Sequence, residues 1–462
     1  MLVVGAGPAG MAAATATASA GLRTVLVDEA HSPGGQVWRA VTTTPVSERF
    51  ILGADYWCGT DAAEALAASN VTYLPNATVW GLDETGTVSL TAAGTARRIA
   101  AARVIIATGA QERPFPVPGW TLPGVMTVGA AQGLLKSSAL YPSGKLVIAG
   151  TGPLIWLYAA QLLRAGGRIE RILDTTEPAA RWRALRHLPA FLTSSYVAKG
   201  LALMAKVRRQ VPVVRAVEHL AIEGDEHVTT VRYRSREGES QVAADTVLLH
   251  QGVVPQVNLA MAAGVHHHWD EQQLCFVPVL DATGRSNLER IFVAGDSAGI
   301  AGWEAAEDRG RIAAAAVIEA LDPKAARSPS IEGLQRRLAR KTRARRFLDE
   351  FFRPPDQFRI PKGATTVCRC EDVTASEVES AVALGALGPA QLKSYTRCGM
   401  GPCQGRMCGL TVTEIMAACR EVPPSQIGYF RLRPPVKPVT VQELASMPTD
   451  DDDANAVTAR RR

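Results

Sequence analysis

The chain has 462 residues, of which 47% are hydrophobic and 20% are charged, and this balance excludes a disordered protein. Its net charge of +6 is spread over 50 basic and 44 acidic side chains, so charge gives no reason to expect a nucleic-acid partner. Apolar runs are short and none approaches the roughly 20 residues that span a bilayer, and no secretion signal precedes Gly5, so we expect a cytoplasmic chain.

The chain opens with a strand, a glycine-rich turn, a helix and a second strand. We expect a strand at Leu2–Val4, a helix over Met11–Ala20 and a strand at Thr24–Val27, with Gly5-Ala6-Gly7-Pro8-Ala9-Gly10 as the turn. In such a turn the first glycine permits the bend, the second lets a pyrophosphate approach and the third lets the helix pack on the strand. The helix N-terminus supplies free N–H groups to the phosphates. Glu29, or Asp28 one position earlier, is placed to bind ribose hydroxyls.

Three later motifs accompany this dinucleotide-binding unit. They are Pro33-Gly34-Gly35-Gln36, the strand end Ala107-Thr108-Gly109 and the stretch Val293-Ala294-Gly295-Asp296. Together the motifs resemble those of the two-dinucleotide-domain flavoproteins, the glutathione-reductase-like disulfide reductases and their relatives. The resemblance implies FAD, with Val79 at the adenine and Asp296 at the ribityl chain and phosphate. The implied FAD contacts are Gly5, Gly7, Pro8, Ala9, Gly10, Asp28, Glu29, Gly35, Gln36, Val79, Ala107, Thr108, Gly109, Gly295 and Asp296.

A second fingerprint follows the strand Lys145–Ala149 and reads Gly150-Thr151-Gly152-Pro153-Leu154-Ile155. A helix to about Ala165 and a strand at Arg171–Leu173 complete the unit. The resemblance implies a nested NAD(P)H domain with Gly150, Gly152 and Asp174 as contacts. Ile155 replaces the third glycine and crowds the helix–strand contact, and no basic pair follows Asp174 for a 2′-phosphate. We therefore expect poor NAD(P)H binding, with another nucleotide or an empty fold as alternatives.

The sequence offers no credible catalytic acid, base or nucleophile beside the flavin motifs, so we name no catalytic residue. The family's redox cysteine pair is absent from residues 34–50, which argues against thiol–disulfide chemistry on the flavin. Cys58 is expected to be a buried small hydrophobe. We expect the run His266–His268 in an exposed loop, and His250 is either a structural histidine or part of the flavin side.

An amphipathic basic helix is predicted within residues 331–352. We favour a connecting helix, and the alternative is docking on an acidic partner or an anionic membrane face.

Five of the eight cysteines lie between Cys368 and Cys408, in a Cys-x-Cys pair followed by a predicted helix over Ala375–Leu384 and a glycine-rich loop. Thiolate ligands select zinc or iron–sulfur, and structural zinc sites prefer a wider first pair. The module resembles the bacterioferritin-associated-ferredoxin-like [2Fe–2S] domain, although its second pair is more widely spaced. The resemblance implies Cys368, Cys370, Cys403 and Cys408 as ligands, and Cys398 comes too early and is dispensable. We expect positive φ angles at Gly399, Gly401 and Gly405.

The combined motifs resemble the α (A) subunits of heteromeric FAD-dependent amino-acid and opine dehydrogenases, a family with opine oxidase, hydrogen cyanide synthase and dye-linked proline and D-hydroxyproline dehydrogenase members. The implied fold is α/β, a glutathione-reductase-like flavoprotein plus a small C-terminal α-rich [2Fe–2S] domain. The predicted boundaries are 1–118 and 246–328 for the FAD domain, 119–245 for the nested domain, 329–360 for a basic linker, 361–425 for the [2Fe–2S] domain and 426–462 for a tail.

The resemblance implies an electron-transferring subunit that accepts electrons from a flavoprotein β subunit of amino-acid-oxidase type, which oxidises the C–N bond. It leaves room for a small γ ferredoxin-like subunit, an FMN at a subunit interface and peripheral contact with electron acceptors at the inner membrane. Two alternatives stay open. One is a self-contained NAD(P)H-dependent FAD/[2Fe–2S] reductase, and the other is a non-catalytic redox-sensing or structural subunit.

Overall fold

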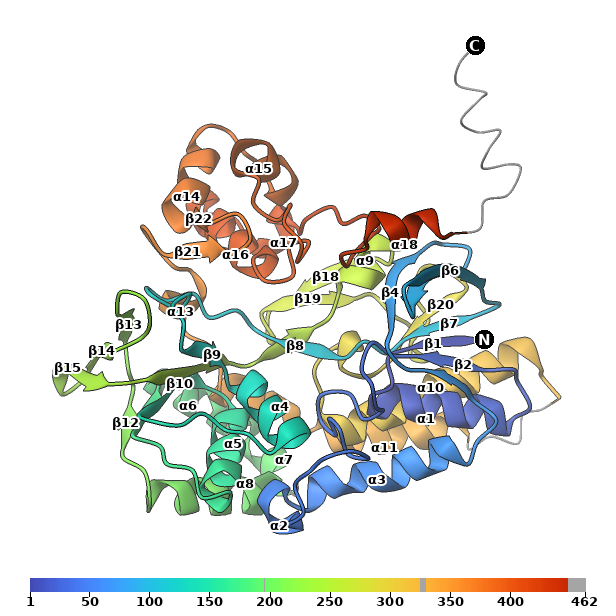
Figure 1. Ribbon diagram of the computed structural model, residues 1–462, viewed down its shortest axis with the longest axis horizontal. Coiled ribbons are helices and arrows are strands. Elements are labelled where there is room, and N and C mark those ends of the chain that lie inside the picture. The colour runs from blue at the N-terminus through green and yellow to red at the C-terminus, as the bar shows by residue number, and fades with distance from the viewer. Residues whose placement is uncertain (195, 325–329, 448–462) are drawn as a thin grey trace.

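The computed structural model describes residues 1–194, 196–324 and 330–447 (Figure 1). Two α/β bodies lie side by side, and a smaller helical module, drawn in orange, lies at their junction. Within the described ranges, no helix is both long and apolar enough to cross a membrane. Of the predicted tail, residues 426–462, those beyond position 447 lie outside the described residues.

Five short parallel strands form the sheet of the first body. Their order is β20 (Ile291–Val293), β7 (Val104–Ile106), β1 (Leu2–Val4), β2 (Val25–Val27) and β3 (Thr72–Leu74). The long helix α10 (Trp303–Leu321) packs against α1 (Pro8–Ser19) so tightly that a Cβ on Gly310 would lie 2.2 Å from the Ala9 carbonyl oxygen. The predicted first βαβ unit is confirmed, with its helix beginning at Pro8.

An antiparallel sheet and two further helices complete this body. The sheet consists of β4 (Ala77–Leu82), β5 (Thr87–Ala92) and β6 (Thr95–Ala100), and the helices are α2 (Arg49–Leu52) and α3 (Ala54–Ala67). Cys58, predicted to be buried, is exposed on α3, because it lies on the outward side of this helix, whereas Tyr56 and Gly59 face the core.

The second body is inserted into the first and has its own parallel sheet. The strand order is β12 (Val213–Arg215), β11 (Arg171–Asp174), β10 (Leu146–Thr151), β16 (Thr246–Gln251) and β9 (Val125–Thr127). Its helices are α4 (Val128–Ser138), α5 (Pro153–Arg164), α6 (Pro178–Ala184), η1 (Leu185–His187), α7 (Leu188–Leu192) and α8 (Tyr196–Arg208). A separate antiparallel sheet contains β13 (His219–Glu223), β14 (Thr230–Ser235) and β15 (Gly238–Ala243). The two fingerprints thus lead into two separate sheets, as the two-domain prediction requires.

Two antiparallel crossing strands, β8 (Ala110–Glu112) and β17 (Val253–Pro255), connect the two bodies. The chain then forms α9 (Asn258–Ala262), the hairpin of β18 (His267–Asp270) and β19 (Cys275–Pro278), and η2 (Gly295–Ala298). The run His266–His268 was expected in a loop, but its last two residues begin β18. There the imidazole of His267 bonds the Val265 carbonyl, and burial lowers the pKa of His267 to about 4.

The basic segment forms two helices, α11 (Ile331–Thr342) and α12 (Arg345–Phe351), followed by α13 (Asp356–Arg359). The fully buried carboxylate of Asp308 on α10 contacts Arg337, Lys341 and Arg311. Part of the positive charge is therefore balanced inside the chain, which favours the connecting-helix interpretation.

The C-terminal module is α-rich, as predicted. It consists of β21 (Thr366–Cys368), β22 (Val373–Thr374), α14 (Ala375–Ala383), α15 (Pro389–Thr396), α16 (Gly409–Arg420) and α17 (Pro424–Ile427). A capping box between Thr374 and Glu377 begins α14, which matches the predicted helix. The chain then returns to the first body, where α18 (Val441–Ala445) lies on β6 (Figure 1).

Candidate functional site

The first glycine turn is built for close backbone approach. A Cβ on Gly5 would lie 2.4 Å from the Ala107 carbonyl oxygen, and a Cβ on Gly10 would lie 1.7 Å from the Gly5 carbonyl oxygen. A Cβ on Gly35 would meet Gly7 Cα at 2.9 Å, so the two glycine motifs touch each other. The N-cap of α1, Gly7, makes no side-chain cap. Open N–H groups beside a glycine cradle fit a diphosphate.

The two acidic residues after β2 have different roles. Asp28 accepts hydrogen bonds from Ala6 N at 2.5 Å and Ala30 N at 2.7 Å, so its carboxylate holds the turn together. The side chain of Glu29 is 58% exposed and contacts the ammonium of Lys437. Glu29 is therefore the acid that remains open to a ribose. Val79, the predicted adenine contact, lies nearly buried on β4.

The strand ends that carry the other predicted flavin residues are neighbours, because β7 and β20 pair in parallel. Thr108 and Gly109 leave β7 beside Gly295 and Asp296, which leave β20. Asp296 Oδ1 accepts hydrogen bonds from Ala301 N at 2.9 Å and Gly302 N at 3.2 Å, which shapes the start of α10. Gly302 makes no side-chain cap, so a second open helix N-terminus lies at this edge of the sheet. These residues fit an FAD, and the open N-terminus of α1 would bind its phosphates.

The second glycine turn has the same close contacts but a different surrounding. A Cβ on Gly150 would lie 1.7 Å from the His250 carbonyl oxygen, and one on Gly152 would lie 2.8 Å from His250 Nε2. His250 is 2% exposed and its Nδ1 lies 2.6 Å from Glu112 Oε1. Glu112 also accepts a hydrogen bond from Gly129 N at the start of α4. The pair thus ties β8, β16 and α4 together, which is a structural role for His250.

Asp174, the predicted ribose acid of the second unit, is already bonded within the protein. Its carboxylate accepts a hydrogen bond from Thr176 N at 2.9 Å and pairs with Arg181 at 3.0 Å. Its side chain is 7% exposed. A ribose role for Asp174 stays a prediction, and it would require the Arg181 pair to open.

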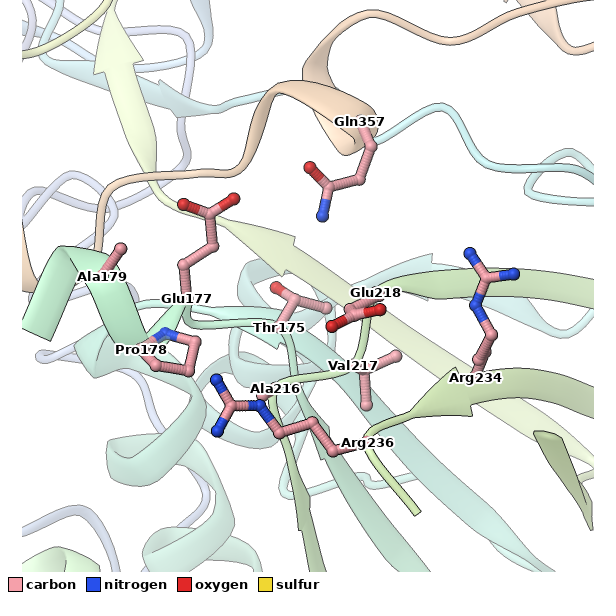
Figure 2. Close-up of a pocket in the computed structure, with 10 residues that line it drawn as sticks. All are labelled: Thr175, Glu177, Pro178, Ala179, Ala216, Val217, Glu218, Arg234, Arg236 and Gln357. Carbon is pink, nitrogen blue, oxygen red and sulfur yellow. The ribbon is translucent and has the colours of Figure 1, made fainter. Parts of the chain in front are cut away.

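A cavity of about 450 Å³ lies beyond the ends of β11 and β12 (Figure 2). Its charged lining consists of Glu177, Glu218, Arg234 and Arg236. The hydroxyl of Thr175 in its wall is buried without a hydrogen-bond partner among the described residues. Sequence reasoning missed the two arginines, because they come from β14 and the turn after it and carry no local motif.

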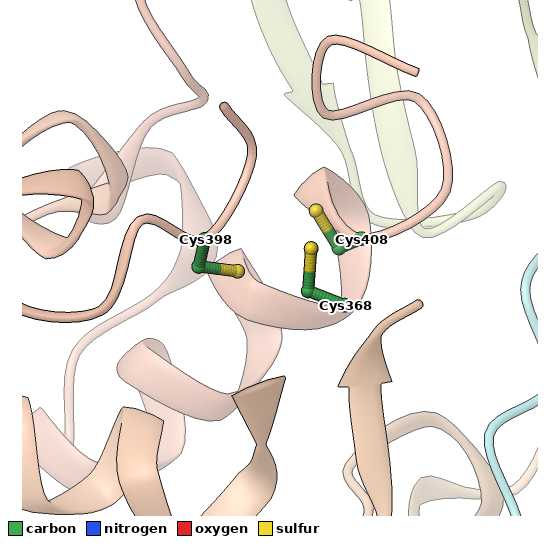
Figure 3. Close-up of side chains that lie close together, drawn as sticks. All are labelled: Cys368, Cys398 and Cys408. Atoms are coloured by element: carbon green, nitrogen blue, oxygen red, sulfur yellow. The ribbon is translucent and has the colours of Figure 1, made fainter. Parts of the chain in front are cut away.

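Three cysteines of the module come together (Figure 3). The sulfur atoms of Cys368, Cys398 and Cys408 all lie within 4.8 Å of one another, and all three residues are buried. Hydrogen bonds from the Cys398 and Cys408 thiols lower the pKa of Cys368. Three buried sulfur atoms this close together form a donor set suited to a soft metal.

Cys370 and Cys403 form a second pair beside this triad. Partial shielding from water raises the pKa of the Cys370 thiol, and the Cys403 side chain adds to the shift. Cys370 is exposed and Cys403 is half-buried. The structure thus divides the four predicted ligands between two groups and places Cys398 with Cys368 and Cys408. The predicted ligand set, with Cys398 as the dispensable cysteine, stays a prediction.

The glycines of the loop are required for two different reasons, backbone conformation and lack of space for a side chain. Gly399 and Gly405 have positive φ angles of 82° and 77°, as expected, and the ring of Phe430 fills the space beside both. Gly401 is not among the residues with positive φ, contrary to the prediction. It is required for space, because a Cβ there would lie 2.2 Å from the Cβ of Cys370.

The cysteine loop is bound to the strand that leaves the flavin motifs. Gln111 Nε2 on β8 donates to the Arg406 carbonyl at 2.9 Å, and Asn258 Nδ2 on α9 donates to the Gln404 carbonyl at 3.0 Å. Arg113, which follows β8, lies 3.8 Å from Glu414 of α16, and both side chains are buried. Through these contacts the loop packs against residues that directly follow Thr108 and Gly109 in the sequence. Sequence reasoning missed all three residues, because nothing local distinguishes them.

Comparison with known proteins finds family models that match both the α/β part of the chain and the C-terminal module. The pyridine nucleotide-disulphide oxidoreductase family model matches residues 1–316, and the sarcosine oxidase A3 domain model matches residues 362–447. The opine oxidase A subunit of Agrobacterium tumefaciens (strain Ach5) is 48% identical over 100% of this chain and 94% of its own length. Hydrogen cyanide synthase subunit HcnB of Pseudomonas aeruginosa is 32% identical over 97% of this chain and 99% of its own length.

A solved structure shares the fold over almost the whole chain. L-proline dehydrogenase from P. horikoshii superposes with a TM-score of 0.71 and covers 96% of this chain and 78% of that protein. Its sequence identity is 19%, so this likeness concerns the fold alone.

Proposed function

We propose an electron-relay role for this chain, which belongs to the pyridine nucleotide-disulphide oxidoreductase family and, within it, to the relatives of the opine oxidase A subunit, and is therefore an FAD-dependent oxidoreductase subunit. In this role it passes electrons from a partner flavoprotein through its FAD to an iron–sulfur cluster. The relatives at 48% and 32% identity are named as subunits, which supports a heteromeric assembly. The proposed partner is a β subunit of amino-acid-oxidase type that oxidises a C–N bond.

The observation that carries this proposal is the docking of the cysteine loop on β8. A flavin accepts electrons in pairs and releases them singly, which suits a one-electron acceptor nearby. Gln111 and Asn258 bind the backbone of the loop at Arg406 and Gln404, so the loop is fixed relative to the strand that follows Thr108. Fixed placement of donor and acceptor sites is what an electron relay needs.

The residues beside the flavin motifs do not suggest chemistry on an amine. Glu112 and His250 bond each other, and Arg113 donates to the carbonyls of Gln273 and Leu274. We therefore place substrate oxidation on the partner. An opine is the favoured substrate class because of the relatives' name, with proline-type and hydroxyproline-type amino acids as alternatives. The proposal also includes a γ ferredoxin-like subunit, an FMN at a subunit interface and a membrane-associated electron acceptor.

We propose a [2Fe–2S] cluster held by Cys368, Cys370, Cys403 and Cys408. Cys398 is the rival ligand, because its sulfur lies in the triad with Cys368 and Cys408. Three buried thiols whose sulfur atoms lie within 4.8 Å of one another favour a metal over five unliganded cysteines.

Five single Cys→Ala variants of the full chain, with Cys58→Ala as the matched control on a distant helix, test this proposal. Iron and acid-labile sulfide should be lost in each true ligand variant and kept in Cys398→Ala and Cys58→Ala, with FAD retained throughout. Loss in Cys398→Ala together with retention in Cys403→Ala would reverse the ligand choice. Bound zinc without sulfide would refute the electron relay.

A further inference from the structure

Residues 429–447, which we call the strap, run from the cysteine loop back to the first body (Figure 1). At the start of the strap, the Phe430 ring fills the space beside Gly399 and Gly405 of the loop. At its end, α18 lies on β6, where the Ser446 hydroxyl accepts a hydrogen bond from Ala96 N at 3.0 Å. The strap is therefore anchored on two bodies that are far apart in the sequence.

The middle of the strap lies along β4, the strand of the predicted adenine contact. Val436 N donates to the Trp80 carbonyl at 2.8 Å. The Val436 side chain is 3% exposed and belongs to the same apolar cluster as Val79 and Val27. Pro434 lies beside Gly81, where a Cβ built on the glycine would lie 3.5 Å from the Pro434 Cβ, an ordinary van der Waals contact. The strap thus forms part of the wall at the adenosine end of the fold.

Lys437 follows directly and brings its ammonium to the acidic end of β2. It contacts Glu29 Oε2, and the charge of Asp28 also acts on it. The Lys437 side chain is 26% exposed, whereas that of Glu29 is 58% exposed. Because Lys437 contacts Oε2, Glu29 Oε1 is left for a ribose hydroxyl. The carboxylate of Asp28 is not available, since Ala6 N and Ala30 N bind it.

We propose that the strap completes the FAD site at its adenosine end and that Lys437 is a positioning residue that holds the Glu29 carboxylate toward the ribose. An exposed glutamate loses side-chain freedom when it binds a ribose, and a partner that fixes it beforehand reduces that cost. The ammonium also offsets two carboxylates that lie close to an anionic diphosphate. The inference rests on FAD binding by the first body and goes beyond it, since it assigns a C-terminal residue to that site.

Titration of the apo full-length chain with FAD, followed by flavin fluorescence, tests the proposal. Lys437→Met should raise the FAD Kd about fivefold, the effect of losing a partly exposed ion pair. Lys437→Arg, which keeps the charge, should retain most of the affinity. Lys362→Met removes an exposed lysine elsewhere and should leave the Kd unchanged.

A double-mutant cycle separates positioning from a general loss of stability. If Lys437 acts through Glu29, the effects of Lys437→Met and Glu29→Gln on the FAD Kd should not add. Val436→Asp places a charge in the buried contact and should weaken FAD binding further, with faster trypsin cleavage at Arg431. An unchanged Kd in Lys437→Met, tighter binding in it, or full additivity with Glu29→Gln would overturn the proposal. Failure of the unaltered chain to bind FAD would instead refute the flavin assignment.

Discussion

Lys136 places an ammonium group inside the protein, where the two larger bodies meet. Its side chain is 4% exposed and donates to the carbonyls of Gln36 and Val37, both at 3.0 Å, and to the amide oxygen of Gln132 at 2.9 Å. Burial lowers the pKa of Lys136 to about 7, and the positive charge of Arg39 adds to this shift. All of these partners are neutral oxygens, so hydrogen bonds replace an ion pair at this junction.

The lowered pKa predicts a pH dependence of stability. Between about pH 7 and the ordinary lysine pKa of 10.5, the unfolded chain binds a proton that the folded chain has lost, so stability rises with pH across this window. Each tenfold loss of proton affinity on folding corresponds to about 1.4 kcal/mol, less what relaxation of the site recovers. Lys136→Met should remove this rise, and melting temperatures from pH 7 to 9 measure it. Lys362→Met, at an exposed lysine, should keep the wild-type slope, and parallel profiles for wild type and Lys136→Met would contradict the prediction.

At the scale of secondary structure elements, the two βαβ units differ at the third glycine position of the fingerprint. Gly10 lets α1 approach β1 until no side chain fits between them, whereas Ile155 is buried at the equivalent position of α5. The second acid, Asp174, is held by Arg181 and Thr176. Both features act against a dinucleotide in its usual place. Because a cavity lies beside Arg234 and Arg236, we retain the proposal that a different nucleotide binds the nested body.

These differences predict that NAD(P)H reduces the flavin poorly. Anaerobic mixing of the FAD-loaded chain with one equivalent of NADH should leave the flavin absorption band largely unchanged over minutes. Dithionite serves as the positive control and should bleach the same band fully, since it needs no binding site. Rapid bleaching by NADH would favour the self-contained reductase instead.

The elements that the sequence predicted are those whose signals are local. Both glycine turns, their strands and helices, and the helix after Thr374 follow from periodicity and short motifs. The contacts that finish the sites are not local: Lys437 and Glu29 are 408 positions apart, and Gln111 and Arg406 are 295 apart. No motif links such pairs, because packing of complete elements brings them together.

Cys398 illustrates the same limit within one module. Its linear spacing from Cys370 placed it outside the expected ligand set. In the structure, Arg397 adopts a left-handed φ of 61° at the end of α15, which turns the chain sharply there. The sulfur of Cys398 therefore reaches Cys368 and Cys408. A turn of this kind at a non-glycine residue has no reliable sequence signal.

At the scale of the whole molecule, three bodies are joined around the flavin motifs. The crossing strands β8 and β17 connect the two α/β bodies, and the cysteine module binds β8 and α9 through Gln111 and Asn258. The strap then runs from the module to the first body, where it is hydrogen-bonded to β4 and β6. This arrangement fixes the cysteine module to the strand that follows the flavin motifs, which the proposed electron relay requires. We therefore expect this subunit to pass electrons on and not to oxidise a substrate itself.

The last prediction follows from that organisation: the isolated chain should not oxidise amines. Glu112 and His250 are bonded to each other, so neither is free to remove a proton from a substrate. The chain, loaded with FAD and assayed alone with an artificial electron acceptor, should show no reduction with an opine, proline or glycine. The same preparation should gain activity when the partner flavoprotein is added, which controls for a damaged flavin. Dye reduction by the lone chain with any of these substrates would place amine oxidation on this subunit and refute its role as a relay.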